Sequence, residues 1–350
     1  MKPIYFLLPI LSLMVACAQT ENDKPEKDPT SMEMEAPDWA IVIHGGAGTI
    51  LPKNMTPERE ASIRSAMSEA LAAGEEVLSS GGSAADAVEV TIHILEDSPH
   101  FNAGKGAVFT HEGTNSLDAS FMTGHDRQAG AVAGVTNIKN PISLARAVLD
   151  HSEHVMLSGK GAEDFALSRG MDTISADWFY TESRYQSLQR VIEREAAGNS
   201  STGAILNAPD SKYGTVGCVA LDRSGNLAAG TSTGGMTNKR YDRIGDSPVI
   251  GAGTFADNTS CGVSCTGHGE YFIRWAVAHD VHARMSYAGA SLEEAANAVI
   301  HDVLAEVGGS GGLIALDRNG NIAMPFNTPG MYRGYKKAGE EEVISFYGDF

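Results

Sequence analysis

Basic residues and cysteines are both scarce in this chain. Its 350 residues carry 26 Lys and Arg against 44 Asp and Glu, a formal charge of −18, and no run of Lys or Arg offsets the excess. A surface of this sign repels nucleic acids and anionic membranes, so we expect neither as a partner. The four cysteines match no zinc spacing and leave an odd number after Cys17 is assigned to a lipid, so they give no disulfide framework. We expect Cys218, Cys261 and Cys265 to be buried thiols, and a Cys261–Cys265 bridge is the alternative.

The N-terminal apolar run is too short to cross a bilayer. It extends from Ile4 to Val15, is broken by Pro9 and ends in Ala16-Cys17. This pattern predicts a bacterial lipoprotein signal peptide over residues 1–17 with Cys17 lipidated; ordinary secretion with cleavage nearby is the alternative. Residues 18–37 are charged and contain proline, so they predict a disordered tether. We therefore expect an exported, periplasmic protein whose only membrane attachment is a lipid anchor in the outer membrane.

A phosphate-binding loop is also missing. The apolar stretch 39–43 is followed by His44-Gly45-Gly46-Ala47-Gly48, which lacks both the Lys-Ser/Thr of a P-loop and the GxGxxG spacing. We interpret 44–48 as a tight turn at the floor of a site, with His44 as a packed, hydrogen-bonded side chain.

Thr215 lies where a long polar stretch meets an apolar strand pattern. Residues 197–214 have the composition of a linker, and 216–221 read as a buried strand that turns at 222–226. If the Thr215 hydroxyl attacks the Gly214 carbonyl, an acyl shift and hydrolysis leave Thr215 as a new N-terminus. Its amine, with an unperturbed pKa of about 7.7–8.0, can then act as the base for its own hydroxyl. The simpler interpretation is that Gly214 and Thr215 only begin a strand.

The remaining chain alternates strand and helix patterns. Residues 219–228 and 314–323 share an apolar strand, a Gly/Asn turn and a second strand, so both predict β-hairpins. Ser291 and Glu294 predict a capping box. Strands are also predicted at 107–109, 116–122 and 130–135, and helices at 56–80, from 83 onward, 141–151, 159–167, 183–196, 269–285 and 292–307. Strands, helices and strands in this order favour stacked layers.

Several motifs occur in a fixed order around Thr215. They are HGGAG at 44–48, FNAG at 101–104, YGTVG at 213–217, TSTGGMTNK at 231–239, RIGDSP at 243–248, SCTGHGE at 264–270 and MPFNTPGMYR at 324–333. Together they resemble the plant-type asparaginase/isoaspartyl peptidase family of N-terminal nucleophile hydrolases. The resemblance implies an α+β fold, a four-layer αββα sandwich, and autocleavage between Gly214 and Thr215. It implies a large subunit over 38–214, with its linker at about 197–214, a small subunit over 215–350, and an (αβ)2 assembly.

The resemblance also implies roles for individual residues. Thr215 is the expected nucleophile beside Thr233, Thr266 and Gly267 are expected to bind the oxyanion, and Asn102 lies near that site. Arg243 and Asp246, with Thr266 and Gly267, are expected to bind the substrate, since a guanidinium holds an α-carboxylate and a carboxylate holds an α-ammonium. No cofactor is implied for catalysis. A structural sodium ion is expected on the backbone carbonyls of Leu95, Glu96, Ser98, Phe101, Ala103 and Lys105. Asp118 is expected to be a structural hydrogen-bonding group.

The implied reaction is hydrolysis of β-aspartyl amide bonds in a small-molecule substrate, either an isoaspartyl dipeptide or L-asparagine. A glycosylasparaginase is the first alternative, but such enzymes typically carry an acidic residue before the Thr, where this chain has Gly214. An uncleaved surface lipoprotein that only binds is the second. Residues 240–242 look bulky for the family, which leaves the preferred leaving group open.

Overall fold

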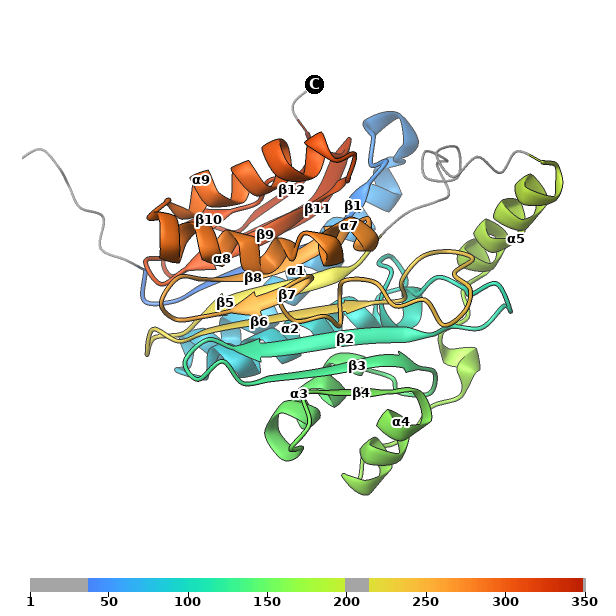
Figure 1. Ribbon diagram of the computed structural model, residues 1–350, viewed down its shortest axis with the longest axis horizontal. Coiled ribbons are helices and arrows are strands. Elements are labelled where there is room, and N and C mark those ends of the chain that lie inside the picture. Colours follow the sequence, from blue (N-terminus) through green and yellow to red (C-terminus); the bar gives the residue numbers. More distant parts are fainter. Residues whose placement is uncertain (1–36, 199–213, 349–350) are drawn as a thin grey trace, which may run out of the picture. The chain divides into compact units, whose positions relative to one another are not determined.

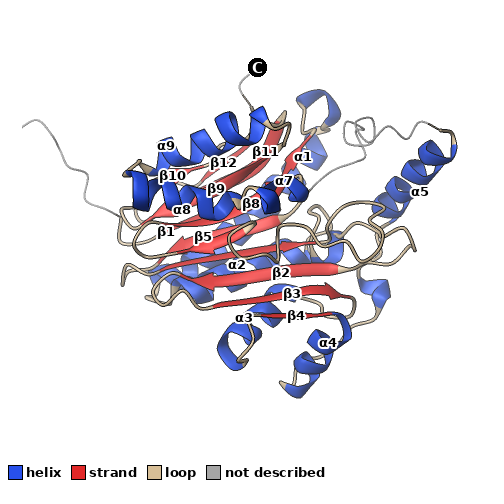
Figure 2. Ribbon diagram, viewed as in Figure 1, coloured by secondary structure: helices blue, strands red, loops and turns tan. Residues whose placement is uncertain are grey.

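The computed structural model describes residues 37–198 and 214–348. Cys17, the predicted signal peptide, nearly all of the tether and most of the linker at 197–214 lie outside these residues. The described chain forms four layers, helices, sheet, sheet and helices, which confirms the predicted αββα sandwich (Figures 1 and 2).

The larger sheet has eight strands in the order β12-β11-β1-β5-β6-β2-β3-β4, and only the β3–β4 pair is parallel. Its strands are β1 (Ala40–Gly48), β2 (Leu117–Thr123), β3 (Ala129–Val135), β4 (Met156–Ser158), β5 (Val216–Leu221), β6 (Leu227–Thr233), β11 (Gly330–Lys337) and β12 (Val343–Tyr347). The central strands β1, β5 and β6 are buried on both faces.

The smaller sheet has four strands in the order β10-β9-β8-β7. They are β7 (Thr254–Ala256), β8 (Cys261–Gly267), β9 (Gly311–Asp317) and β10 (Ile322–Ala323). Strands β8 and β9 pack against β1, β5 and β6 of the larger sheet. Because side chains alternate along a strand, Ile41 and Ile43 of β1 face one apolar core, and Ala40 and Val42 face the other.

Helices cover the two outer faces. On the larger sheet lie α1 (Pro57–Ser79), α2 (Ala84–Asp97), α3 (Pro141–His151) and α4 (Gly159–Ser168), and α5 (Glu182–Ala196) leads toward Gly198. On the smaller sheet lie α8 (Val277–Ala288) and α9 (Leu292–Asn297), which continues as a π-helix (Ala298–Leu304); α7 (Gly269–Arg274) follows β8. Three-residue 3-10 turns occur at Pro52–Asn54, Gly104–Gly106 and Ala176–Trp178.

The helix starts follow their capping residues. The side chains of Thr56 and Ser83 accept hydrogen bonds from backbone N–H groups of the first turns of α1 and α2. Ser291 and Glu294 form the predicted capping box of α9. The two predicted hairpins are present as β5–β6 and β9–β10. Cys218, Cys261 and Cys265 are buried free thiols, as predicted. No helix in the described ranges is long and apolar enough to cross a membrane.

Three predicted elements differ in the structure. The strand predicted at 107–109 is absent, because amide side chains take up the backbone groups that a ladder would use: Asn102 Oδ1 accepts from Val108 N at 2.9 Å, and Asn115 Nδ2 donates to the carbonyls of Ala107 and Val108, both at 3.1 Å. The turn predicted at 44–48 is instead a continuation of β1, with a bulge between His44 and Gly46.

The helix predicted over 269–285 is broken. Ala276 has φ 47° and ψ 49°, the left-handed conformation, and separates α7 from α8. A single left-handed residue interrupts the right-handed helix at this point. The apolar residues keep their 3.6-residue spacing across the break, so the sequence pattern does not reveal it.

Candidate active site

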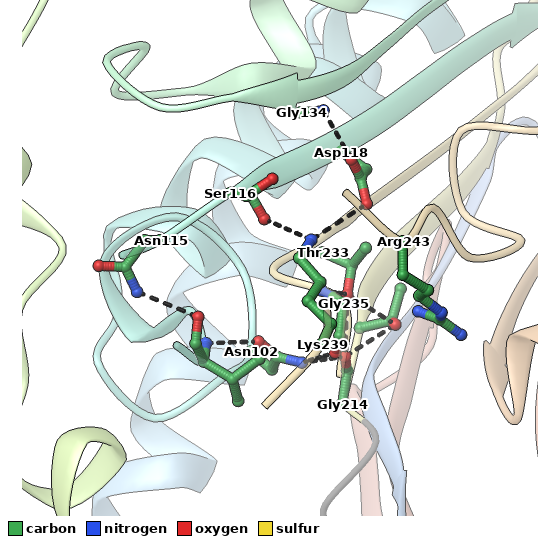
Figure 3. A network of polar contacts seen from close by, with 12 residues as sticks. Asn102, Asn115, Ser116, Asp118, Gly134, Gly214, Thr233, Gly235, Lys239 and Arg243 are labelled. Atoms are coloured by element: carbon green, nitrogen blue, oxygen red, sulfur yellow. Dashed lines mark hydrogen bonds and ion pairs between the residues drawn. The ribbon is translucent and has the colours of Figure 1, made fainter. Parts of the chain in front are cut away.

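Thr215 lies immediately before β5, at the point where this strand enters between β1 and β6. Three side chains contact the carbonyl oxygen of the preceding residue, Gly214 (Figure 3). Thr215 Oγ1 lies 2.8 Å from it, Asn102 Nδ2 donates to it at 2.8 Å, and Thr233 Oγ1 donates to it at 3.1 Å. The oxygen of the Gly214–Thr215 peptide bond is therefore surrounded by donors, with the Thr215 hydroxyl next to the bond itself.

Thr233 reaches this point because of strand register. Val216 pairs with Ser232, so the next residue of β6 stands beside Thr215, and the two Oγ1 atoms are 3.2 Å apart. The N–H of Gly235 donates to Thr233 Oγ1 at 3.0 Å. Because that contact uses a lone pair of the hydroxyl, its proton remains available for the Gly214 oxygen.

Asn102 uses its whole side-chain amide. Its Nδ2 donates to the carbonyls of Gly214 and Gly235, the latter at 2.7 Å, while its Oδ1 accepts from Val108 N. All three contacts distinguish the nitrogen from the oxygen of the amide, so the orientation of the side chain is fixed.

Two glycines allow the chain to pass this closely. A Cβ on Gly46, in the β1 bulge, would lie 2.9 Å from the Cα of Gly214, and its φ of +108° is one that other residues rarely adopt. A Cβ on Gly217 would collide with Ser264 Oγ and His44 Nε2. The glycines around Thr215 therefore follow from packing against β1 and β8.

A buried chain of hydrogen-bonded side chains begins at the carbonyl oxygen of Thr215. His44 Nδ1 lies 3.0 Å from the Thr215 carbonyl oxygen, which can only accept, so Nδ1 carries the proton and Nε2 accepts from Ser264 Oγ at 3.0 Å. Burial lowers the pKa of His44 to about 3, which keeps the ring neutral. This confirms the packed, hydrogen-bonded histidine predicted at this position.

The same chain continues across the space between the sheets. Ser264 contacts Thr231 at 2.7 Å, Thr231 contacts Thr254 at 2.5 Å, and Thr254 contacts Ser120 at 2.7 Å. Ser120 Oγ donates to the carbonyl of Ser247 at 2.5 Å. Hydrogen bonds thus connect the Thr215 backbone to the residue that follows Asp246.

Asp246 is a buried carboxylate near Arg243. Burial raises its pKa to about 7, and the Arg243 charge opposes that shift. Its Oδ2 has no hydrogen-bond partner among the described residues. A Cβ on Gly269 would lie 2.8 Å from Arg243 Nη2 and 2.9 Å from Asp246 Oδ1, so only a glycine fits between the two side chains. Arg243 Nε and Nη2 donate to Glu270 at 2.9 and 3.0 Å, which fixes the plane of the guanidinium.

Thr266 and Gly267 end β8. Thr266 is buried, and its Oγ1 accepts from the N–H of Ala47 at 3.3 Å, next to the Gly46 bulge that packs on Gly214. No contact within hydrogen-bond distance joins either residue to Thr215 among the described residues, so this predicted pair approaches the site through the end of β1.

A profile described as asparaginase matches residues 37–345. The chain belongs to this asparaginase family. It is 49% identical over 307 residues to the isoaspartyl peptidase of Escherichia coli, covering 88% of this chain and 95% of that protein. It is 44% identical over 313 residues to the probable isoaspartyl peptidase/L-asparaginase 2 of Arabidopsis thaliana, covering 85% and 95%. The isoaspartyl peptidase/L-asparaginase of Bos taurus is 39% identical over 312 residues, covering 88% and 96%.

In this asparaginase-family chain the predicted site residues form three groups. Asn102, Thr215 and Thr233 all contact the Gly214 oxygen, and Arg243 and Asp246 lie together at Gly269. Thr266, which precedes Gly267, is linked to the first group through the N–H of Ala47. Asn102 and Arg243 approach from opposite sides in Figure 3.

Sequence reasoning missed Lys239 in this family member. Its side chain is buried, with Nζ 2.8 Å from the Ser116 carbonyl oxygen and 3.7 Å from Asp118 Oδ2, while Asp118 Oδ1 accepts from Gly134 N at 2.8 Å (Figure 3). Burial raises the pKa of Asp118 and lowers that of Lys239, and each charge partly offsets the shift of the other. An acidic residue within an apolar strand pattern was the signal that a buried cation would be needed.

The loop after α2 turns its backbone inward. Gly104 lies so close to the Glu96 carbonyl oxygen, and Gly106 to that of Phe101, that a Cβ at either glycine would collide with it. The Glu96 side chain points elsewhere, since its Oε1 accepts from Ile142 N at 3.1 Å and from Ser232 Oγ at 2.6 Å. Of the predicted sodium ligands, the Ala103 carbonyl accepts a hydrogen bond from Gly106 N at 3.1 Å, and the sodium ion stays a prediction.

Proposed function

We propose that this chain is a self-processing hydrolase of β-aspartyl amide bonds that acts on isoaspartyl dipeptides and L-asparagine. The observation that carries the proposal is the Thr215 hydroxyl 2.8 Å from the Gly214 oxygen, which also receives hydrogen bonds from Asn102 and Thr233. Two of the relatives at 39–44% identity are called isoaspartyl peptidase/L-asparaginase, and the bacterial relative at 49% is called isoaspartyl peptidase.

Processing begins when Thr215 Oγ1 attacks the Gly214 carbonyl carbon. Negative charge develops on the Gly214 oxygen, where Asn102 Nδ2 and Thr233 Oγ1 already donate, so these donors stabilise the tetrahedral intermediate. The C–N bond breaks, the hydroxyl proton passes to the Thr215 nitrogen, and an ester forms. Water hydrolyses this ester to give a Gly214 carboxylate and a free Thr215 amine. Cleavage here divides the chain into subunits 38–214 and 215–350.

The processed Thr215 then repeats this chemistry on substrate. Its amine takes the hydroxyl proton as Oγ1 attacks the β-carbonyl, and the oxyanion is held by Thr266 Oγ1 and the N–H of Gly267. The amine returns its proton to the leaving nitrogen, and a β-aspartyl ester remains on Thr215. Water cleaves that ester and restores the enzyme.

Arg243 and Asp246 hold the aspartyl part of the substrate. Asp246 Oδ2, buried and without a partner among the described residues, is suited to an α-ammonium, and Arg243 beside it is suited to the α-carboxylate. The same pair would hold the aspartyl part of a sugar-linked asparagine, so a glycosylasparaginase differs from this proposal only in the leaving group that it accepts.

Four further expectations belong to this proposal. The carbonyls of Leu95, Glu96, Ser98, Phe101, Ala103 and Lys105 would hold a structural sodium ion that fixes the loop carrying Asn102. The processed chains would assemble as (αβ)2. Export through a signal peptide over 1–17 and lipidation of Cys17 would attach the protein to the outer membrane on its periplasmic side. The tether would separate this anchor from the hydrolase.

The test is the intact mass of the purified protein with N-terminal sequencing of any fragment. We expect a fragment that begins at Thr215, and we expect Thr215→Val to remain a single inactive chain. Cleavage that survives Thr215→Val would remove Thr215 as the nucleophile. A wild-type chain that stays unbroken after long incubation would favour a protein that only binds.

A further inference from the structure

A small cavity of about 40 Å³ borders Gly214, the residue before the proposed scissile bond. Its lining includes the β1 bulge, Asn102, Tyr332 and Gly214. Three side chains that can carry positive charge also line it: Arg59, His100 and Arg184. Arg243 and Asp246 are not part of it. The cavity therefore lies on the Asn102 side of the scissile bond, away from the residues that we assign to the aspartyl group.

A larger cavity of about 360 Å³ adjoins it on the outside. The two cavities share Arg59, His100 and Arg184, and the larger one is also lined by Arg190. In a chain with a formal charge of −18, cationic side chains thus line a path from the scissile bond outward.

Arg59 and Arg184 come from different elements, α1 and α5, and both line the two cavities. Arg184 Nε donates to the Gly106 carbonyl at 2.8 Å, which fixes this side chain. Burial and then the Arg59 charge lower the pKa of Arg184 to about 10. Burial, followed by the same two cations, lowers the pKa of His100, so this ring is neutral near pH 7.

No carboxylate among the described residues lies within 4.0 Å of Arg59 or Arg184, whereas the neighbouring Glu60 is already held by Arg64 at 3.2 Å and by the Tyr347 hydroxyl at 2.8 Å. Two cations gathered without a counterion repel each other, and an anion placed between them removes that repulsion.

The chemistry of the proposed reaction brings an anion to this place. The leaving nitrogen takes its proton from the Thr215 amine, so it lies next to the Thr215 nitrogen, on the Gly46 and Gly214 side of the residue. In an isoaspartyl dipeptide this nitrogen carries a Cα and an α-carboxylate, whose carbon is only about 2.5 Å away by standard geometry. When L-asparagine is the substrate, the leaving group is ammonia and carries no such charge.

We propose that Arg59 and Arg184 form a subsite for the α-carboxylate of the amino acid released from an isoaspartyl dipeptide. The subsite rests on the proposed function and determines specificity within it. It favours dipeptides with a free C-terminal carboxylate over L-asparagine, since only the former leave a carboxylate beside the two guanidinium groups.

The test compares three substrates: β-aspartylleucine, β-aspartylleucinamide and L-asparagine. Processed wild-type protein should show a kcat/KM at least about tenfold higher for the free acid than for the amide, the effect of one charge-assisted hydrogen bond. Arg59→Gln, at an exposed position, should lower kcat/KM for the acid about tenfold and leave the amide and L-asparagine within about twofold. Lys53→Gln removes an equal charge just before α1 and should change none of the three.

The outcomes separate the two proposals. Equal rates for acid and amide in the wild type, or an equal loss on all three substrates in Arg59→Gln, would overturn the subsite while the hydrolase stands. A loss for the acid in Lys53→Gln that matches the loss in Arg59→Gln would assign the effect to net charge and also overturn the subsite. Processed protein that hydrolyses none of the three would overturn the proposed function itself.

Discussion

Asn102 is the side-chain amide that would support the proposed self-cleavage. It donates to the Gly214 oxygen at 2.8 Å, where charge develops when the peptide bond is attacked. Removing one such donor slows comparable reactions by about 10²–10³. We therefore expect Asn102→Ala to slow the appearance of the Thr215 fragment by about that factor, followed as intact mass against time.

Asn115→Ala is the matched control for Asn102→Ala. Asn115 holds the same loop through the carbonyls of Ala107 and Val108 but does not contact Gly214 among the described residues. If Asn115→Ala slows cleavage as much as Asn102→Ala, the effect comes from the loop as a whole, and the donor role of Asn102 is wrong.

Asp246 gives a second prediction at this scale, on pH. Burial raises its pKa to about 7, and only the ionised carboxylate binds an α-ammonium. Below pH 7 each unit should therefore raise KM for L-asparagine about tenfold, while kcat follows the Thr215 amine, whose unperturbed pKa is about 7.7–8.0. Asp246→Asn should show a high KM with no pH dependence. A wild-type KM that is constant between about pH 5.5 and 8 would remove Asp246 from the ammonium site.

At the scale of elements, the sequence predicted those features that depend on residues close together in the chain. Thr56, Ser83 and Ser291 begin their helices as expected because a capping hydroxyl acts within one turn. The contact between Thr215 and Thr233 was also predictable, since a hairpin joins β5 and β6 and brings the two residues together.

The remaining features depend on partners far along the chain. Residues 107–109 are a loop because Asn102 and Asn115 bind their backbone, and the β1 bulge at Gly46 is required by Gly214. Arg59 and Arg184 share a cavity although 125 residues separate them in the numbering, so no motif could place them together. Such contacts exist only in three dimensions.

The break between α7 and α8 makes a prediction about stability. Ala276 occupies the left-handed region with φ 47° and is exposed, and this conformation costs a non-glycine residue about 1–2 kcal/mol. Ala276→Gly should raise the free energy of unfolding by about 1 kcal/mol, after the greater freedom of glycine in the unfolded chain is subtracted. Thermal unfolding should show a Tm about 1–2 °C higher. Ala283→Gly, inside α8, should lower the stability by about 1 kcal/mol, and a Tm increase in both variants would contradict this explanation.

For the whole molecule, the position of the proposed cleavage point within the larger sheet determines whether the two fragments would stay together. Residues before Gly214 supply β1, β2, β3 and β4 of the larger sheet, and residues after it supply β5, β6, β11 and β12. In space β1 lies between β11 and β5, and β6 pairs with β2, so strands of the two segments alternate in three adjacent pairs.

Cutting the Gly214–Thr215 bond should therefore leave the molecule in one piece. Separating the fragments would expose the hydrogen-bonding edges of β1, β2, β5, β6 and β11 together with both apolar cores. The free-energy cost of this exposure is far larger than the effect of losing one covalent link between the fragments. We expect processed protein and Thr215→Val to show the same native mass per assembly and each a single urea transition, while two chains separate only under denaturing conditions. Fragments that dissociate in native buffer, or two separate urea transitions in the processed form alone, would show that the interleaved sheet does not hold the halves together.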